Sequence, residues 1–322
     1  MGSAEANVRI VLATCGFLGT LLNIFVFYTL FQVKIGSLLT NTLLKFQCVF
    51  DAFACFVTFL YKLIGPEIVT GVEHVDRFFC YLWYSDNLIW LGISLSVCNI
   101  VCASLDRAVA VFLPLVYKKR QIFLVCFACA YQIPAATILF IPNLFSRDYI
   151  SGRCKFGISV ESVVIRQYIV AEKYTWLIVV YVIPLAVIIS THTAVIVYMS
   201  SHWNLGKLPA KQEMTSKEEE QWRMRRHMRE IALTTVMMAG TLLVCHAYDA
   251  ITYVLDSVGA YQYVILSLAQ QTGLIPIVLS SCILPCITVT RIKTLRRYVI
   301  YDLIPILFAK FGLEDKPIEA PQ

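Results

Sequence analysis

Seven long apolar stretches, separated by short polar segments, make up most of the chain. They cover residues 10–33, 37–61, 78–105, 121–145, 174–201, 231–255 and 262–290. Each is longer than the roughly 20 residues that a helix needs to cross a bilayer, and helices satisfy their own backbone hydrogen bonds there. The pattern therefore predicts an all-α membrane protein, a seven-transmembrane helix bundle.

Basic residues are distributed unevenly between the segments that join these stretches. About fifteen lie on one side of the predicted bundle, concentrated at 118–120, 207–229 and 291–297, and about eight lie on the other side. Positive residues favour the cytoplasmic side. Residues 1–9 are therefore predicted to be an extracellular N-terminus, residues 10–290 the membrane domain, and residues 291–322 cytoplasmic, in a multi-pass protein of the plasma membrane.

Two cytoplasmic segments are predicted to be helical. Residues 217–230 hold good helix formers and should extend the sixth helix beyond the membrane. Residues 291–308 alternate basic and apolar residues, which predicts a short amphipathic helix on the membrane surface. Residues 312–322 are polar and are expected to be disordered.

Composition argues against several other classes of protein. Hydrophobic residues make up 58% of the chain and charged residues 15%, with a mean hydropathy of +0.70, whereas a soluble domain carries roughly a quarter charged residues. The net charge of +6 reflects topology and contact with membrane lipid, so no nucleic-acid partner is expected. Ten of the 12 cysteines lie in apolar stretches, where cysteine is a small hydrophobe, and no zinc-site spacing occurs.

The third stretch ends in a recognisable pattern. Asp106 and Arg107 are followed by Ala108 and then by Pro114 and Leu115. This resembles the end of the third helix in rhodopsin-like (class A) G-protein-coupled receptors, where Asp-Arg-Tyr precedes a Pro-Leu turn. Further matching positions in the other stretches are Asn23, Asn41, Asp51, Ser96, Pro184 and Pro285.

The resemblance implies roles for several residues. Asp106 would hold Arg107 in the resting state, and Arg107 would meet a heterotrimeric G protein when released. The basic residues Arg225, Arg226 and Arg229 would line the same cleft, or would simply attract anionic lipid. Cys80 and Cys154 would form the extracellular disulfide.

A polar cluster is expected inside the membrane around Asp51. By resemblance this carboxylate would bind a sodium ion or a proton, with Asn23, Ser96, Ser280 and Ser281 as neighbouring polar groups. The alternative is a carboxyl group that is neutral and merely hydrogen-bonded. Intramembrane ionisable groups are costly and usually functional, so Asp51 remains a candidate ion site.

Several positions depart from the family pattern. Leu284 and Thr288 replace the asparagine and tyrosine of the seventh helix, and His246 and Tyr248 replace the tryptophan and proline of the sixth. The usual activation route is therefore in question. The seventh stretch contains no lysine, so no retinal Schiff base is expected there. Sodium is the only cofactor candidate, and no catalytic nucleophile–base pair or metal cluster indicates an enzyme.

A ligand pocket is expected between the outer halves of the third, fifth, sixth and seventh helices. Ile89 stands where amine receptors carry an aspartate, which argues against an ordinary monoamine receptor. The aspartates Asp86 and Asp249 could meet a cation or could bond to Tyr248, Gln270 or each other. The candidate pocket residues are Trp83, Asp86, Trp90, Tyr181, His246, Asp249, Tyr253, Gln270 and Gln271.

The sequence thus predicts a G-protein-coupled receptor that responds to an extracellular ligand, either a peptide or a small cationic molecule. Two alternatives stay open. The first is a signalling-silent seven-helix protein that scavenges ligand or partners another receptor. The second is a small-molecule transporter, which would want charged residues along a continuous path. A histidine inside the bundle, His246, could also sense pH, although a buried, hydrogen-bonded histidine is the simpler interpretation.

Overall fold

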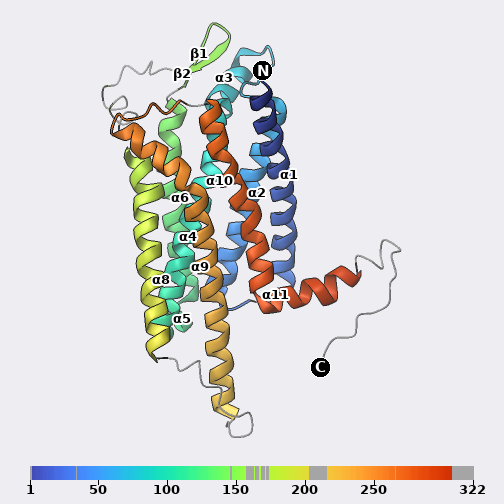
Figure 1. Ribbon diagram of the computed structural model, residues 1–322, viewed down its shortest axis with the longest axis vertical. Helices are drawn as coiled ribbons and strands as arrows, with labels where there is room; N and C mark the ends of the chain where they lie inside the picture. The colour runs from blue at the N-terminus through green and yellow to red at the C-terminus, as the bar shows by residue number, and fades with distance from the viewer. Residues whose placement is uncertain are drawn as a thin grey trace.

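The protein is a bundle of long helices in a computed structural model, which describes residues 2–33, 35–145, 147–156, 163, 167, 171, 174–202, 216–264 and 266–306. Seven helical spans in these residues are long and apolar enough to cross a membrane, which confirms the predicted fold. They run side by side in Figure 1, with the N-terminus at one end of the bundle and the chain's last helices at the other.

The helices occupy the following ranges. The first three spans are α1 (Ser3–Gln32), α2 (Leu38–Ile64) and α3 with α4 (Glu73–Leu82 and Asn87–Phe112). The next are α6 (Gln121–Phe145), then η2 with α8 (Leu177–Val182 and Ile183–His202), then α9 (Ser216–Ser257) and α10 (Leu268–Arg291). Short helices are η1 (Tyr84–Asp86), α5 (Pro114–Lys119), α11 (Lys293–Arg297) and η3 (Tyr298–Leu303).

The side chains are sorted as a lipid environment requires. Large apolar residues such as Phe17, Leu21 and Ile24 are at least 46% exposed on α1, whereas Asn23 on its inner face is 1% exposed and Asp51 on α2 is fully buried. Polar side chains are costly in lipid unless they are partnered within the protein. The polar residues therefore converge along the bundle axis.

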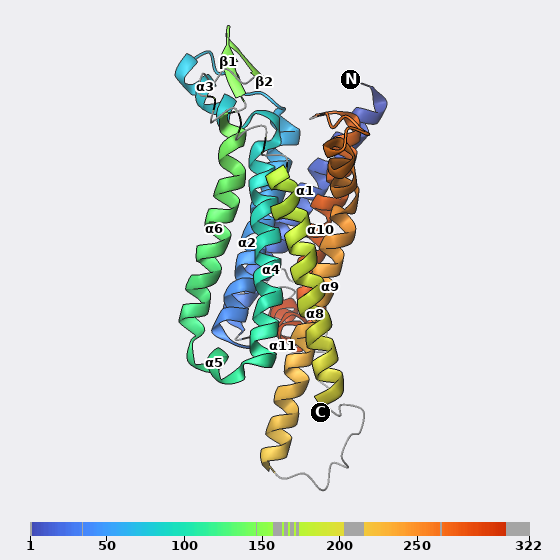
Figure 2. The ribbon, with the colours of Figure 1, turned by 90° about the vertical axis from the view of Figure 1, so that its left-hand side faces the viewer.

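A β-hairpin adds to the predicted all-α fold. Strands β1 (Arg147–Ile150) and β2 (Arg153–Phe156) pair antiparallel, with Tyr149 opposite Cys154. Ser151 and Gly152 join them at φ values of 52° and 78°, as a two-residue hairpin turn requires. The hairpin, α3 and the N-terminus lie at one end of the bundle, called here the hairpin end, and α5, α11 and the start of α9 lie at the opposite, tail end (Figures 1 and 2).

The third span is broken where the sequence predicted one continuous helix. Ser85 and Asp86 take left-handed backbone conformations, with φ values of 64° and 56°, between α3 and α4. Such values are uncommon for residues other than glycine. The break turns α3 away from the α4 axis and buries the Asp86 side chain, which is 2% exposed.

Other boundaries differ less from the predictions. Helix α1 begins at Ser3, so most of the predicted N-terminal segment 1–9 is helical. Helix α9 begins at Ser216, which confirms the extension of the sixth span. In α11 and η3 the apolar residues Leu295, Val299 and Leu303 are buried, while Lys293, Arg296 and Arg297 are exposed, so the predicted amphipathic helix is confirmed. Residues 307–322, which include the predicted disordered tail, lie outside the described part.

Glycines bring the first three spans into close contact. A Cβ atom on Gly16 would lie 2.7 Å from the Cys55 carbonyl oxygen of α2. A Cβ atom on Gly92 of α4 would lie 2.8 Å from the Ala54 Cβ atom of α2. Neither distance leaves room for a side chain, so α1, α2 and α4 approach one another at their backbones, as small residues allow in membrane bundles.

Candidate functional site

The predicted Asp106–Arg107 pair lies at the tail end of α4, and both residues are buried. The Arg107 guanidinium forms an ion pair with the Asp106 carboxylate and donates a hydrogen bond to the Thr40 hydroxyl of α2. Thr40 Oγ1 also donates to Asp106 Oδ2 at 3.0 Å. Removing one member of a buried pair leaves a charge without compensation, so the arrangement holds Arg107 inside the bundle.

Tyr117 closes over this pair from the short helix α5, which begins at the predicted Pro114. Its hydroxyl donates to Asp106 Oδ1 at 2.6 Å and also contacts the hydroxyl of Ser37, the residue before α2. Burial, and then the charge of Asp106, raises the pKa of Tyr117, so the phenol remains a donor at neutral pH. Sequence reasoning missed Tyr117, because only the folded loop returns it to the end of α4.

The three basic residues of the α9 extension lie elsewhere. Arg225, Arg226 and Arg229 are exposed, and Arg226 Nε lies 3.5 Å from Glu230 Oε1 on the same helix. A cavity of about 20 Å³ beside Arg107 is instead lined by Ile231, Thr234, Thr235 and Met238 of α9. None of the three arginines lines this small cavity.

Asp51 is the centre of a buried polar cluster in the membrane. Gln47 Nε2 donates to its Oδ2 atom at 2.8 Å, and the hydroxyls of Ser96 and Ser281 donate to Oδ1 at 2.8 and 3.1 Å. Ser96 and Ser281 were predicted neighbours. Gln47 was missed, although it precedes Asp51 by one helical turn and therefore faces the same side.

Two other predicted neighbours do not touch the Asp51 carboxylate. Ser280 donates to the Ile277 carbonyl at 2.6 Å, and Asn23 Nδ2 donates to the carbonyls of Gly19 and Ser281 at 2.9 and 2.8 Å. The Asn23 Oδ1 atom is buried and has no hydrogen-bond partner among the described residues. The cluster thus offers carboxylate, hydroxyl and amide oxygens, the donor type that hard cations prefer.

A cavity of about 100 Å³ lies at the hairpin end of the bundle. Five predicted pocket residues line it, namely Asp86, Trp90, Asp249, Tyr253 and Gln270. The sequence did not indicate its other lining residues, Ser85, Asn87, Asn143, Arg147, Trp176 and Tyr263. Four predicted pocket residues, Trp83, Tyr181, His246 and Gln271, do not line it.

Both aspartates of this cavity already have partners. Asp249 accepts hydrogen bonds from the hydroxyls of Tyr181 and Tyr263, the latter at 3.1 Å. Asp86 accepts from Gln270 Nε2 at 3.0 Å and more weakly from Gln271 Nε2 at 3.5 Å. Burial, and then the charge of Asp249, raises the pKa of Tyr263. Of the neighbours expected for the aspartates, Gln270 is correct and Tyr248 is wrong.

The remaining predicted pocket residues make contacts outside this cavity. Trp83 Nε1 donates to the Gly65 carbonyl at 2.9 Å, and its ring centroid lies 5.7 Å from that of Tyr61. His246 is buried as expected, but its Nδ1 atom has no hydrogen-bond partner in the described residues. Gln271 accepts from the Lys62 ammonium on the side facing α2.

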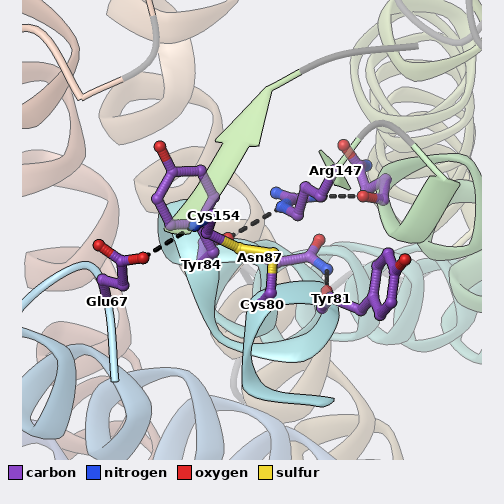
Figure 3. The surroundings of a disulfide bond; sticks show 8 residues. Glu67, Cys80, Tyr81, Tyr84, Asn87, Arg147 and Cys154 are labelled. Atoms are coloured by element: carbon purple, nitrogen blue, oxygen red, sulfur yellow. Dashed lines mark hydrogen bonds between the residues drawn. A yellow bond between two sulfur atoms is a disulfide. The ribbon is translucent and has the colours of Figure 1, made fainter. Parts of the chain in front are cut away.

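The predicted disulfide between Cys80 and Cys154 is confirmed, with a Cα–Cα distance of 5.5 Å. Figure 3 shows how it fixes the hairpin to the start of the third span, where the Cys154 backbone N–H also donates to Glu67 Oε1 at 2.8 Å. Beside it, Arg147 Nε donates to the Tyr84 carbonyl at 2.9 Å. These contacts place Arg147 on the cavity that holds Asp86.

Comparisons with known proteins agree with this architecture. Residues 14–255 match a family model described as serpentine type 7TM GPCR chemoreceptor Srx. A search among curated proteins found no match. The crystal structure of squid rhodopsin is similar in fold, with a TM-score of 0.67 and 14% sequence identity over 98% of this chain and 92% of that chain.

Proposed function

The chain belongs to the Srx family of serpentine seven-helix G-protein-coupled chemoreceptors, and from this membership we propose that it transmits an extracellular chemical signal to a heterotrimeric G protein. It is a multi-pass protein of the plasma membrane. The proposed orientation puts the hairpin end outside the cell and the tail end in the cytoplasm, as the distribution of basic residues favours. The oxidising exterior also suits the disulfide.

The observation that carries the proposal is the buried ion pair at the tail end. Arg107 is held there by Asp106 and Thr40, and Ile231, Thr234 and Thr235 of α9 line the small gap beside it. Displacement of α9 would open this gap and let Arg107 reach a partner, as in other two-state bundles. Ligand binding at the hairpin end would favour that displaced arrangement.

The proposed ligand is a peptide or a small cationic molecule, received in the cavity lined by Asp86 and Asp249. The aromatic rings of Trp90, Tyr253 and Tyr263 lie on the same cavity. Aromatic faces and carboxylates together suit a cation. Such a ligand would have to displace the present partners of the two aspartates.

A signalling-silent scavenger is the second candidate, and the seventh helix favours it. Thr288 stands at the position of the family tyrosine, and its hydroxyl donates to the Leu284 carbonyl of its own helix at 3.0 Å. It therefore contributes no hydrogen bond toward Arg107. A G-protein dissociation assay in cells, across a peptide and amine panel, separates the two candidates. A response supports the receptor, and silence with verified surface expression and excess G protein supports the scavenger.

Tyr117→Phe should raise ligand-independent G-protein activation at least tenfold. The substitution removes a hydrogen bond to the Asp106 carboxylate, and bonds to charged groups contribute about 1.5–3 kcal/mol. The closed arrangement loses this contribution, whereas an arrangement with Arg107 released does not. Basal G-protein dissociation at matched surface expression measures the effect. Tyr301→Phe, at an exposed tyrosine of η3, is the control, and equal basal activity in both variants would contradict the proposed closing role.

Sodium should stabilise the protein through Asp51, with Ser96, Ser281 and Asn23 as the other residues that would hold the ion. A bound cation would supply positive charge to a fully buried carboxylate. We expect the thermal midpoint in detergent to be a few degrees higher in sodium chloride than in N-methylglucamine chloride. Asp51→Asn should abolish the difference, while Asp302→Asn, at an exposed position of η3, should keep it. Equal midpoints for the unmodified protein would favour the neutral, hydrogen-bonded carboxyl.

A further inference from the structure

A second and larger cavity lies at the hairpin end, between α1, α2 and α10. Its volume is about 340 Å³, and its lining residues are Glu5, Val8, Arg9, Tyr61, Lys62, Gly65, Pro66, Leu266, Leu268 and Gln271. It shares no lining residue with the cavity that holds Asp86 and Asp249. We propose that it is a binding site for a small organic carboxylate, anchored by the ammonium group of Lys62.

Lys62 is the charged centre of this cavity. The residue is 7% exposed, and its ammonium group donates to Gln271 Oε1 and lies 5.0 Å from the centroid of the Tyr61 ring. Among the described residues it forms no direct ion pair, and the nearby charge of Asp86 acts on it from beyond Gln271. A buried charge is costly unless it is paired, so an anion in the cavity would remove this cost.

The other charges leave the cavity cationic. Arg9 Nη2 donates to the Leu63 carbonyl at 2.9 Å, which fixes a guanidinium beside the end of α2. Glu5 Oε2 accepts from the Gly2 backbone N–H at 3.2 Å, at the start of its own helix. Among the residues that line the cavity, Lys62 and Arg9 therefore outnumber Glu5, and a carboxylate ligand would balance the difference.

The neutral lining indicates what else the ligand carries. Tyr61 also lines the cavity, and its hydroxyl is buried. Val8, Pro66, Leu266 and Leu268 provide an apolar wall. A carboxylate with a short hydrocarbon body matches this combination, because ligand sites pair an apolar surface with a few polar anchors.

The site is joined to the first cavity by one side chain. Gln271 accepts from Lys62 and donates weakly to Asp86 Oδ2 at 3.5 Å. A carboxylate that draws the Lys62 ammonium away would free Gln271 to bond more closely with Asp86. The inference goes beyond the proposed function, and its binding step does not require G-protein coupling.

The test measures binding directly. The full chain is placed in nanodiscs of zwitterionic phospholipid and titrated with hexanoate by saturation-transfer difference NMR, with empty nanodiscs as the blank for lipid partitioning. Hexanoate should bind at least tenfold more tightly than hexanamide, which has the same body without the charge. Equal affinities for the two compounds, or no binding of hexanoate at millimolar concentration, would overturn the proposal.

Substitutions then identify the anchor. Lys62→Met and Lys62→Gln should each weaken hexanoate binding about tenfold and leave hexanamide unchanged. Lys45→Met is the matched control, because Lys45 also belongs to α2 but lies over the Phe31 ring, 3.6 Å from its centroid. Unchanged hexanoate affinity in a folded Lys62 variant would refute the anchor. If neither variant folds, the comparison of hexanoate with hexanamide on the unmodified chain still tests whether the cavity binds a carboxylate. Binding without any signalling would instead count against the proposed receptor function alone.

Discussion

Arg107→Ala should reduce the proposed G-protein activation at least tenfold at matched surface expression. The guanidinium is the charged group that the closed arrangement buries, between the Asp106 carboxylate and the Thr40 hydroxyl. Alanine cannot form the contact that a released arginine would make with the G protein. The expected loss is at least tenfold, since hydrogen bonds to charged groups contribute about 1.5–3 kcal/mol each.

The Arg107→Ala substitution should be tested both in the unmodified protein and in the Tyr117→Phe variant. In cells exposed to the peptide and amine panel, Arg107→Ala should remove any response of the unmodified protein. In the Tyr117→Phe background, it should remove the raised ligand-independent signal. Arg223→Ala is the control, because this arginine is exposed and pairs only with Glu219 on its own helix, at 2.6 Å, among the described residues. A full response from correctly expressed Arg107→Ala would exclude the Asp106–Arg107 pair as the coupling element.

Cys80→Ser should remove most of the protein from the cell surface. The disulfide joins residues 74 positions apart and fixes the hairpin to the start of the third span. Closing a loop of this length is worth about 4 kcal/mol by the chain-entropy model, which is a large part of the stability of a typical domain. Flow cytometry of a surface tag, together with the thermal midpoint of the purified protein, measures the loss.

The double variant shows whether the bond is responsible. Cys80→Ser and Cys154→Ser should each cause the same loss, and the double variant should be no worse than either, because all three lack one bond. Cys126→Ser, at a free and exposed cysteine, should behave as the unmodified protein does. Additive losses in the double variant would mean that each cysteine acts through its own packing.

The sequence predicted most of the architecture because lipid imposes strict rules on it. Spans of sufficient length and a bias of basic residues identify a seven-helix bundle without any tertiary information. The pairing of Asp106 with Arg107 and that of Cys80 with Cys154 followed from resemblance. The Srx match places the chain in a chemoreceptor family, while the low identity to squid rhodopsin supports only the fold. The finer class A assignment remains a prediction.

Several contacts of the candidate site depend on backbone geometry that no periodic pattern contains. Tyr117 reaches Asp106 only because α5 folds back beneath α4. Asp86 turns toward Gln270 only because the chain takes two left-handed conformations before α4. Gln270 and Gln271 are adjacent in sequence, yet they line different cavities. A helical pattern predicts which face a residue occupies, but not what lies opposite it.

The size of the first cavity has a consequence for pharmacology. It holds about 100 Å³, whereas sites for drug-sized molecules occupy roughly 300–1,000 Å³. A full-sized agonist can enter only if the walls contributed by α4 and α9 separate. A fragment small enough to fit the closed cavity would occupy it without separating them. Efficacy should therefore increase with ligand bulk, and fragments of good agonists should act as antagonists.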